Sequence, residues 1–129
     1  MIEPLIADLM LADTDIATYT DSDIYVTAAP VGTEAPYIVI EATDTPGESD
    51  VLSLTEIDIN LYDYNEDQRP ARGVSQQIKN LLNYGVFPVF GGYETIRIYF
   101  KSRTTIKEAD QKLYRINMSF TGRATETLS

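Results

Sequence analysis

Apolar residues recur at two different spacings along this chain, and these spacings divide it into elements. Leu5, Ile6 and Leu9 follow helical spacing, which predicts a helix over residues 3–11. Residues 24–27 and 37–42 are rich in β-branched and aromatic side chains, which favour strands. The first third of the chain is therefore predicted to form a helix followed by two strands.

The clearest alternation lies in residues 52–64. Ile57 and Ile59 point to one side of the predicted strand, whereas Glu56 and Asp58 point to the other. We therefore expect a long strand with one face on the core and the other face in water.

The second half begins with an amphipathic helix. Pro70 suits the first turn of a helix whose apolar stripe includes Val74, Ile78 and Leu82. Gly85 supplies the C-terminal stop of this helix.

Two alternating strands are predicted to follow, at residues 95–101 and 114–120. Residues 86–93 contain Pro88 and two glycines, so we expect an irregular connection there. The polar residues 123–129 are predicted to form a mobile tail.

This order of elements predicts an α+β fold. Adjacent strands on both sides of a central helix indicate a mainly antiparallel or mixed sheet of about five strands, with the N-terminal helix and the central helix packed on it. The chain has 129 residues and neither repeats nor linkers, so a single domain over residues 1–129 is expected.

The composition excludes several kinds of chemistry. Without cysteine, disulfides and thiolate catalysis are absent, and without histidine the commonest general base and metal ligand are missing. No basic segment precedes the first apolar residues, and no stretch approaches the roughly 20 apolar residues of a membrane span. We expect a soluble protein that is made and used in a cytoplasm.

Charge is divided very unevenly between the two parts of the chain. Residues 1–68 hold sixteen acidic residues and no basic ones, a formal charge of −16. Residues 69–129 hold ten basic and four acidic residues, a formal charge of +6, which leaves −10 overall. These parts can attract each other within one subunit or between neighbouring copies.

Acidic pairs are the only candidates for a metal site. Asp13 with Asp15, or Asp21 with Asp23, offers oxygen ligands to a hard cation. Neither pair belongs to an EF-hand pattern, and aspartates at helix caps and turns explain both pairs. We therefore predict no metal and no cofactor.

A carboxylate-pair hydrolase is the best enzyme hypothesis. Glu56 and Asp58 lie two residues apart on one strand face, a spacing of roughly 7 Å that suits a glycosidase. Every acidic strand face has this spacing, and the chain has no tryptophan to form a sugar platform. We predict that the protein is not an enzyme.

Two further groups of side chains are candidates for contact surfaces. Five of the nine tyrosines either cluster at subunit contacts or lie at the rim of the core, namely Tyr62, Tyr64, Tyr84, Tyr93 and Tyr99. Six bases gather on the last two strands and their connection, namely Arg97, Lys101, Arg103, Lys107, Lys112 and Arg115. Pairing of these bases with acidic surface of the same or a neighbouring subunit is favoured over binding to nucleic acid.

One segment resembles a known family. Residues 23–41 are similar to the opening signature of the tail-completion and tail-terminator proteins of long-tailed bacteriophages. Their sequence is DIYVTAAPVGTEAPYIVIE. In that family a short strand, an Ala-Pro pair and a glycine turn precede a Pro-Tyr pair that starts a β-branched strand. Two later segments agree, INLYDYNEDQRPARGVSQQIKNLL and KEADQKLYRINMSFTGRA. The resemblance covers residues 2–123, and the chain departs from it in its acidic first half and in Pro46-Gly47.

The resemblance implies a structural role in the virion tail or neck, with assembly in the host cytoplasm. Proteins of this family form a homohexameric ring that caps the tail tube, stops its polymerisation and joins the tail to the head connector. The implied partners are other copies of the chain, the tail tube protein and the connector, or stopper, protein. DNA passes through the lumen without tight binding.

Three sets of residues are expected to serve this role. Glu56 and Asp58 are expected to face the lumen, where acidic groups let DNA slide. The connections at residues 43–50 and 102–111 are expected to meet axial partners through Asp44, Glu48, Asp50, Arg103 and Lys107. Contacts between subunits are assigned to Arg97, Lys101 and Arg115.

Two alternatives remain open. The first is another ring-forming neck protein, such as a head-closure or adaptor protein. The second is a monomeric inhibitory module whose acidic half mimics DNA.

Overall fold

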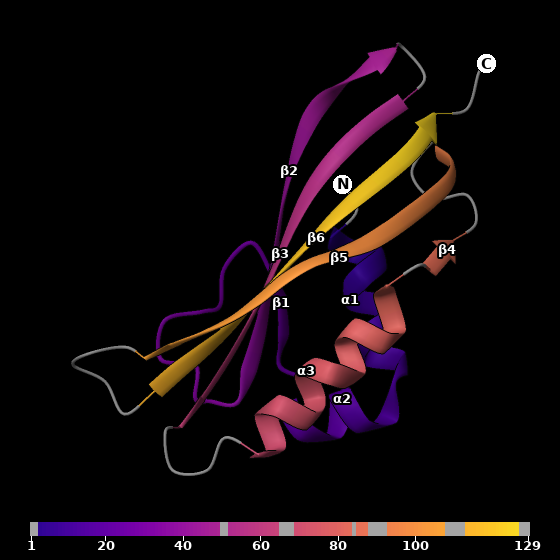
Figure 1. Ribbon diagram of the computed structural model, residues 1–129. Helices are drawn as coiled ribbons and strands as arrows, with labels where there is room; N and C mark the ends of the chain where they lie inside the picture. Colours follow the sequence, from indigo (N-terminus) through magenta and orange to yellow (C-terminus); the bar gives the residue numbers. More distant parts are fainter. Residues whose placement is uncertain are drawn as a thin grey trace.

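A computed structural model describes residues 3–49, 52–64, 69–83, 85–87, 93–107 and 113–126 of the chain. One six-stranded sheet packs against three helices (Figure 1). The helices are α1 (Glu3–Ala12), α2 (Thr14–Thr20) and α3 (Arg69–Leu82). The strands are β1 (Ile24–Val26), β2 (Tyr37–Ser49), β3 (Leu52–Tyr64), β4 (Gly85–Phe87), β5 (Tyr93–Lys107) and β6 (Leu113–Glu126).

This arrangement confirms the predicted α+β class. The strand order is β1-β2-β3-β6-β5-β4, with β1 parallel to β2 and the other neighbours antiparallel. The sheet has six strands because Gly85, expected to end the central helix, and residues 86–87, expected to be irregular, pair with β5 as β4. Within the described segments, no helix is long and apolar enough to cross a membrane.

Alternate residues of the long strands face the helices and form the core. In one cross-strand row, Ile40 lies beside Ile59, which lies beside Met118, and all three are fully buried. Ile78 and Leu82 of α3 pack against this face, as the predicted apolar stripe requires. Burial of both sets removes a continuous apolar surface from water.

Three strands are longer than the sequence pattern predicts. Residues 43–49 continue β2, so the expected long loop at residues 43–50 is wrong, and the hairpin extends to the pair Ser49 and Leu52. Similarly, residues 102–107 belong to β5 and residues 123–126 belong to β6. Cross-strand pairing of these polar segments with their neighbours outweighs their turn-forming composition.

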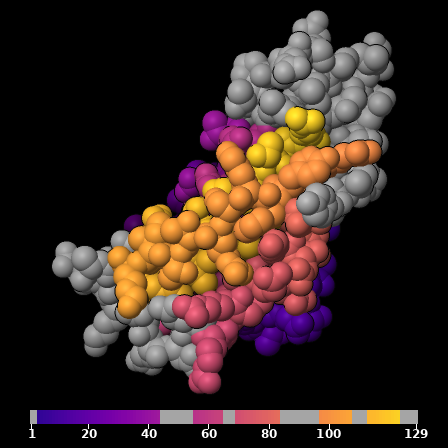
Figure 2. Space-filling view, in the orientation of Figure 1, coloured from indigo at the N-terminus to yellow at the C-terminus, as the bar shows by residue number. Residues whose placement is uncertain are grey.

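An irregularity in β5 changes which side chains face the helices. Phe100 pairs with Phe120, and Ser102 pairs with Ser119, so Lys101 is the extra residue of a β-bulge. Beyond the bulge, the odd-numbered residues of β5 turn to the helix side. β5 itself lies at the surface, with α3 alongside it (Figure 2).

Candidate interaction surfaces

The face of the sheet opposite the helices is called here the open face, and it carries the residues predicted to face the lumen and to join subunits. Glu56 and Asp58 lie on it, on the side of β3 opposite Ile57 and Ile59. Glu41 of β2 is directly beside Asp58. The orientation that the alternation predicts for β3 is therefore confirmed.

Basic residues occupy the other half of the open face. Arg97 of β5 pairs directly with Arg123 of β6, and both side chains are exposed. Arg115 lies on the same face, between Tyr62 of β3 and Ile106 of β5. Like charges opposite each other on a sheet are destabilising, so Arg97 and Arg123 keep an unfavourable pair on the surface.

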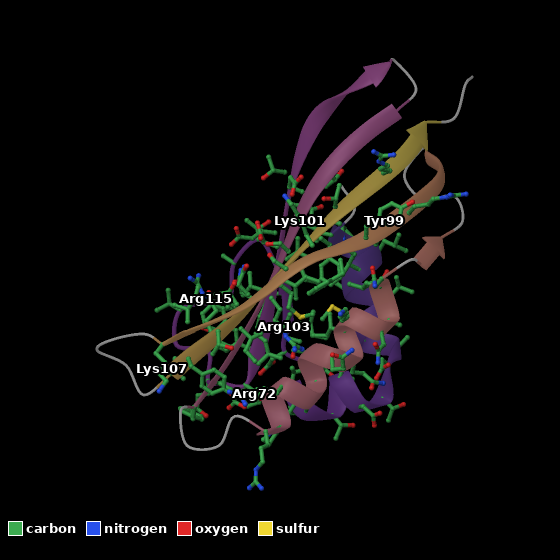
Figure 3. All side chains as sticks on the ribbon, viewed as in Figure 1. Arg72, Tyr99, Lys101, Arg103, Lys107 and Arg115 are labelled. Atoms are coloured by element: carbon green, nitrogen blue, oxygen red, sulfur yellow. The ribbon has the colours of Figure 1, made fainter. Side chains whose placement is uncertain are left out.

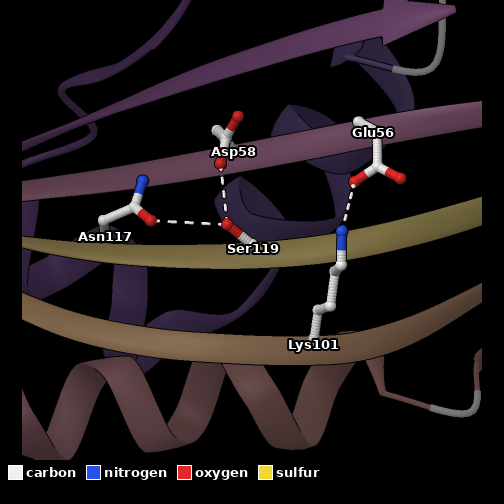
Figure 4. A network of polar contacts seen from close by, with 5 residues as sticks. All are labelled: Glu56, Asp58, Lys101, Asn117 and Ser119. Atoms are coloured by element: carbon white, nitrogen blue, oxygen red, sulfur yellow. Dashed lines mark hydrogen bonds and ion pairs between the residues drawn. The ribbon is translucent and has the colours of Figure 1, made fainter.

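A polar network joins the acidic and basic halves (Figure 4). Lys101 Nζ lies 3.2 Å from Glu56 Oε2, and both side chains are about half exposed. Ser119 Oγ donates to Asp58 Oδ1 at 2.8 Å. The ion pair spans from β5 to β3 across β6, and its exposure limits its contribution to about 0–1 kcal/mol.

The network continues into a partly covered region of the open face. Asn117 Nδ2 donates to Asn60 Oδ1 at 2.9 Å, and Asn60 is only 6% exposed. A buried amide needs such a partner, because an unpaired one costs about 1–3 kcal/mol. Together, these contacts hold Glu56 against Lys101 of β5 and Asp58 against Ser119 of β6.

The residues assigned to axial loops lie elsewhere than expected. Asp44 and Glu48 belong to β2, and Asp50 lies outside the described residues. Arg103 and Lys107 belong to β5 (Figure 3). The two hairpins end at opposite ends of the sheet, since β2 and β3 turn near Ser49 whereas β5 and β6 turn after Lys107.

Arg103 lies on the helix side of β5 rather than on the open face. Its Nη1 donates to Ser75 Oγ on α3 at 3.1 Å. The bulge at Lys101 separates Arg103 from Arg97 and Arg115, so the predicted basic group is divided between two faces. Lys112, the sixth member of that group, lies outside the described residues.

The tyrosines are also dispersed. Tyr62 stacks on Tyr37 across β3 and β2, with ring centroids 4.8 Å apart and an interplanar angle of 17°. Burial, with a smaller effect from nearby Tyr62, raises the pKa of Tyr37. Tyr64 is exposed, whereas Tyr84 and the side chain of Tyr93 lie outside what the structure describes.

The two aspartate pairs lie at the ends of α2. Asp13 is the N-cap, and its Oδ1 accepts from the backbone N–H groups of Asp15 and Ile16 at 3.1 and 3.2 Å. Asp21 forms the C-cap in the left-handed conformation. Asp23 Oδ1 accepts from the hydroxyl of Tyr25 at 3.1 Å.

Comparison with known proteins identifies the class to which this sheet and its surfaces belong. A family model described as "Tail completion protein gp17" matches residues 4–124. The chain therefore belongs to the tail completion protein gp17 family. It is a structural protein of the bacteriophage virion and is located in the tail, in a family that is not known for enzymes.

Two solved structures share the fold. One, from "Virion of native gene transfer agent (GTA) particle", is 13% identical with a TM-score of 0.77, over 93% of this chain and 91% of that one. A second is 13% identical with a TM-score of 0.68, over 99% of this chain and 93% of that one. A search of curated proteins gave no match.

Proposed function

We propose that this protein is a tail terminator. Six copies form a ring on the last disc of the tail tube, which stops polymerisation of the tube and provides the surface that the head connector meets. The observation that carries this proposal is the family match over residues 4–124.

The acidic half of the open face, on β2 and β3, suits the wall of a DNA channel. Glu41, Glu56 and Asp58 lie together on β2 and β3, on the side of the sheet away from the helices. DNA carries about one negative charge per 1.7 Å, so acidic groups on the wall prevent adhesion while the genome passes. In the proposed ring, Glu56 and Asp58 face the lumen.

The hairpin ends and the basic strands supply the remaining contacts. In the proposed ring, each hairpin end meets one of the two axial partners. The first end carries Asp44, Glu48 and Asp50, and the second carries Arg103 and Lys107. They suit this role because the two hairpins end at opposite ends of the sheet. Arg97, Lys101 and Arg115 are assigned to the contact between subunits.

Electron microscopy of particles from a strain that lacks the protein tests the role. We expect abnormally long tails without heads, because nothing stops tube growth, and complementation restores normal length. Tails of normal length that lack only heads would instead indicate a head-closure protein.

The axial contacts are tested in the same assay. A variant with Asp44→Lys and Glu48→Lys keeps the residues of β2 and reverses their charge. We expect it to reduce the joining of tails to heads. Rings of normal mass that fail to join heads would support the assignment of this hairpin end, whereas normal joining would contradict it.

A further inference from the structure

Two strands of the sheet have long edges that no described strand covers. β1 pairs with β2 only at residues 38–40. From Glu41 to Ser49, β2 has β3 on one side and no strand among the described residues on the other. This edge is nine residues long within a strand of thirteen.

β5 has a similar edge on the opposite side of the sheet. β4 pairs with β5 only at residues 96–98, and the backbone N–H of Phe100 donates to Asn83 Oδ1 at 2.8 Å. From Lys101 to Lys107, β6 is the only neighbour of β5 in the described part of the sheet. Figure 2 shows this part of β5 at the surface beside α3.

Uncovered edges of this length favour pairing with another chain. Their backbone N–H and C=O groups form a template for a further strand, and proteins usually cover or shorten such edges. Here the short strands β1 and β4 pair with one part of each edge, and the rest has no further strand beside it among the described residues.

The two edges carry opposite charges. Residues 41–49 of β2 include Glu41, Asp44 and Glu48 and no base, whereas residues 101–107 of β5 include Lys101, Arg103 and Lys107 and no acid. Two β2 edges would repel each other, as would two β5 edges. A β2 edge and a β5 edge attract.

We infer that the β2 edge of one subunit pairs with the β5 edge of the next copy, so that neighbouring sheets join across the subunit boundary. This contact is heterologous, because each subunit uses two different surfaces, and such contacts form a ring when the rotation from one copy to the next closes. The inference rests on the proposed ring and specifies its interface. A sheet continued in this way keeps its open face, with Glu56 and Asp58, on one side of the ring wall and the helices on the other.

Cysteine cross-linking tests the pairing, and the chain provides a clean background because it has no cysteine. Glu41→Cys or Thr43→Cys is combined with Ser102→Cys or Thr104→Cys, which gives four double variants at exposed positions on the open face. Within one subunit, Glu41 and Ser102 lie on strands three spacings apart, roughly 14 Å, which exceeds the reach of a disulfide.

Tails are assembled under reducing conditions with each variant, purified, oxidised and analysed by denaturing electrophoresis. We expect at least one double variant to lose its monomer band and to give a ladder of up to six chains. All four single variants should remain monomeric, as should a control pair on the helices, Asp8→Cys with Thr18→Cys.

Two outcomes would overturn the inference while the proposed ring stands. The first is rings of normal mass in which none of the double variants forms a ladder. The second is a dimer from Ser102→Cys or Thr104→Cys alone, which would indicate contact between two β5 edges. Absence of the unmodified protein from tails would contradict the proposed function itself.

Discussion

At the scale of single residues, Tyr19 connects α2 to the end of the central strand β3. Its hydroxyl donates to Asp63 Oδ2, while Asp63 Oδ1 accepts from the backbone N–H of Tyr64 at 2.7 Å. Burial raises the pKa of Tyr19, and the hydrogen bond to Asp63 and the charge of Asp63 raise it further. Tyr19 therefore stays protonated where an exposed tyrosine begins to ionise.

We expect Tyr19→Phe to lower the free energy of unfolding by about 1–2 kcal/mol at neutral pH, because a hydrogen bond to a carboxylate is lost at a half-buried site. The pKa is higher in the folded state than in the unfolded state, so this contribution is fully present below about pH 10 and declines above it. Urea unfolding of both proteins at about pH 8 and about pH 11 measures the difference.

A matched control is Tyr25→Phe, since Tyr25 donates only to nearby Asp23. We expect a smaller effect from this change. An equal stability difference between Tyr19→Phe and the unmodified protein at both pH values would contradict the assignment of the titrating group.

At the scale of elements, the seven-residue helix α2 depends on its caps and its packing. A helix this short is not stable alone. Asp13 caps its N-terminus, and Asp13 Oδ2 also accepts from Gln77 Nε2 on α3 at 3.3 Å. Ile16 and Thr20 are buried against the core. One side chain therefore fixes the start of α2 and its distance from α3.

We expect Asp13→Ala to lower the free energy of unfolding by about 1–2 kcal/mol, the usual cost of losing an N-cap. Asp13→Asn should cost much less, because the amide oxygen caps equally well. Asp15→Ala is the control, because Asp15 is exposed and lies two residues after the cap. Thermal unfolding of the four proteins compares them, and an equal loss from Asp13→Asn and Asp13→Ala would contradict the capping role.

At the scale of the whole molecule, the division of charge along the sequence becomes a division across the sheet. Acids of β2 and β3 occupy one half of the open face, and bases of β5 and β6 occupy the other. The strand order causes this, because β3 and β6 meet at the centre of the sheet. The chain thus has opposite charges on its two sides, an asymmetry that suits a head-to-tail contact.

We expect the double change Glu56→Lys with Asp58→Lys to slow ejection of DNA from assembled particles, because cations on the channel wall bind phosphate. Asp8→Lys with Asp15→Lys gives the same change in net charge at exposed positions of the helices and should leave the rate unchanged. Ejection kinetics followed by dye fluorescence measure both. Equal rates for the two variants would exclude the lumen assignment.

Much of the fold could be predicted from local sequence, and the candidate site only in part. The alternation around Ile57 and the stripe on α3 give the correct elements, because burial on one face imposes a period that survives in a single sequence. The long loop expected at residues 43–50 is wrong, because pairing with β3 holds the turn-forming residues around Pro46 in a strand.

The bulge at Lys101 is the clearest limit of such prediction. Regular alternation places Arg97, Lys101 and Arg103 on one face, yet the extra residue turns Arg103 toward Ser75 of α3. A bulge depends on how two strands pair, so the composition of one strand does not reveal it.

The sequence by itself determined the types of the longer helices and strands, the open and buried faces of β3, the lack of histidine and cysteine chemistry, and the separation of acidic from basic residues along the chain. Those properties follow from local periodicity and composition. Only the tertiary structure decided the strand order, the full length of the hairpins and the two uncovered edges of opposite charge. Those properties depend on pairing between residues far apart in the sequence, and no local spacing records which strands become neighbours.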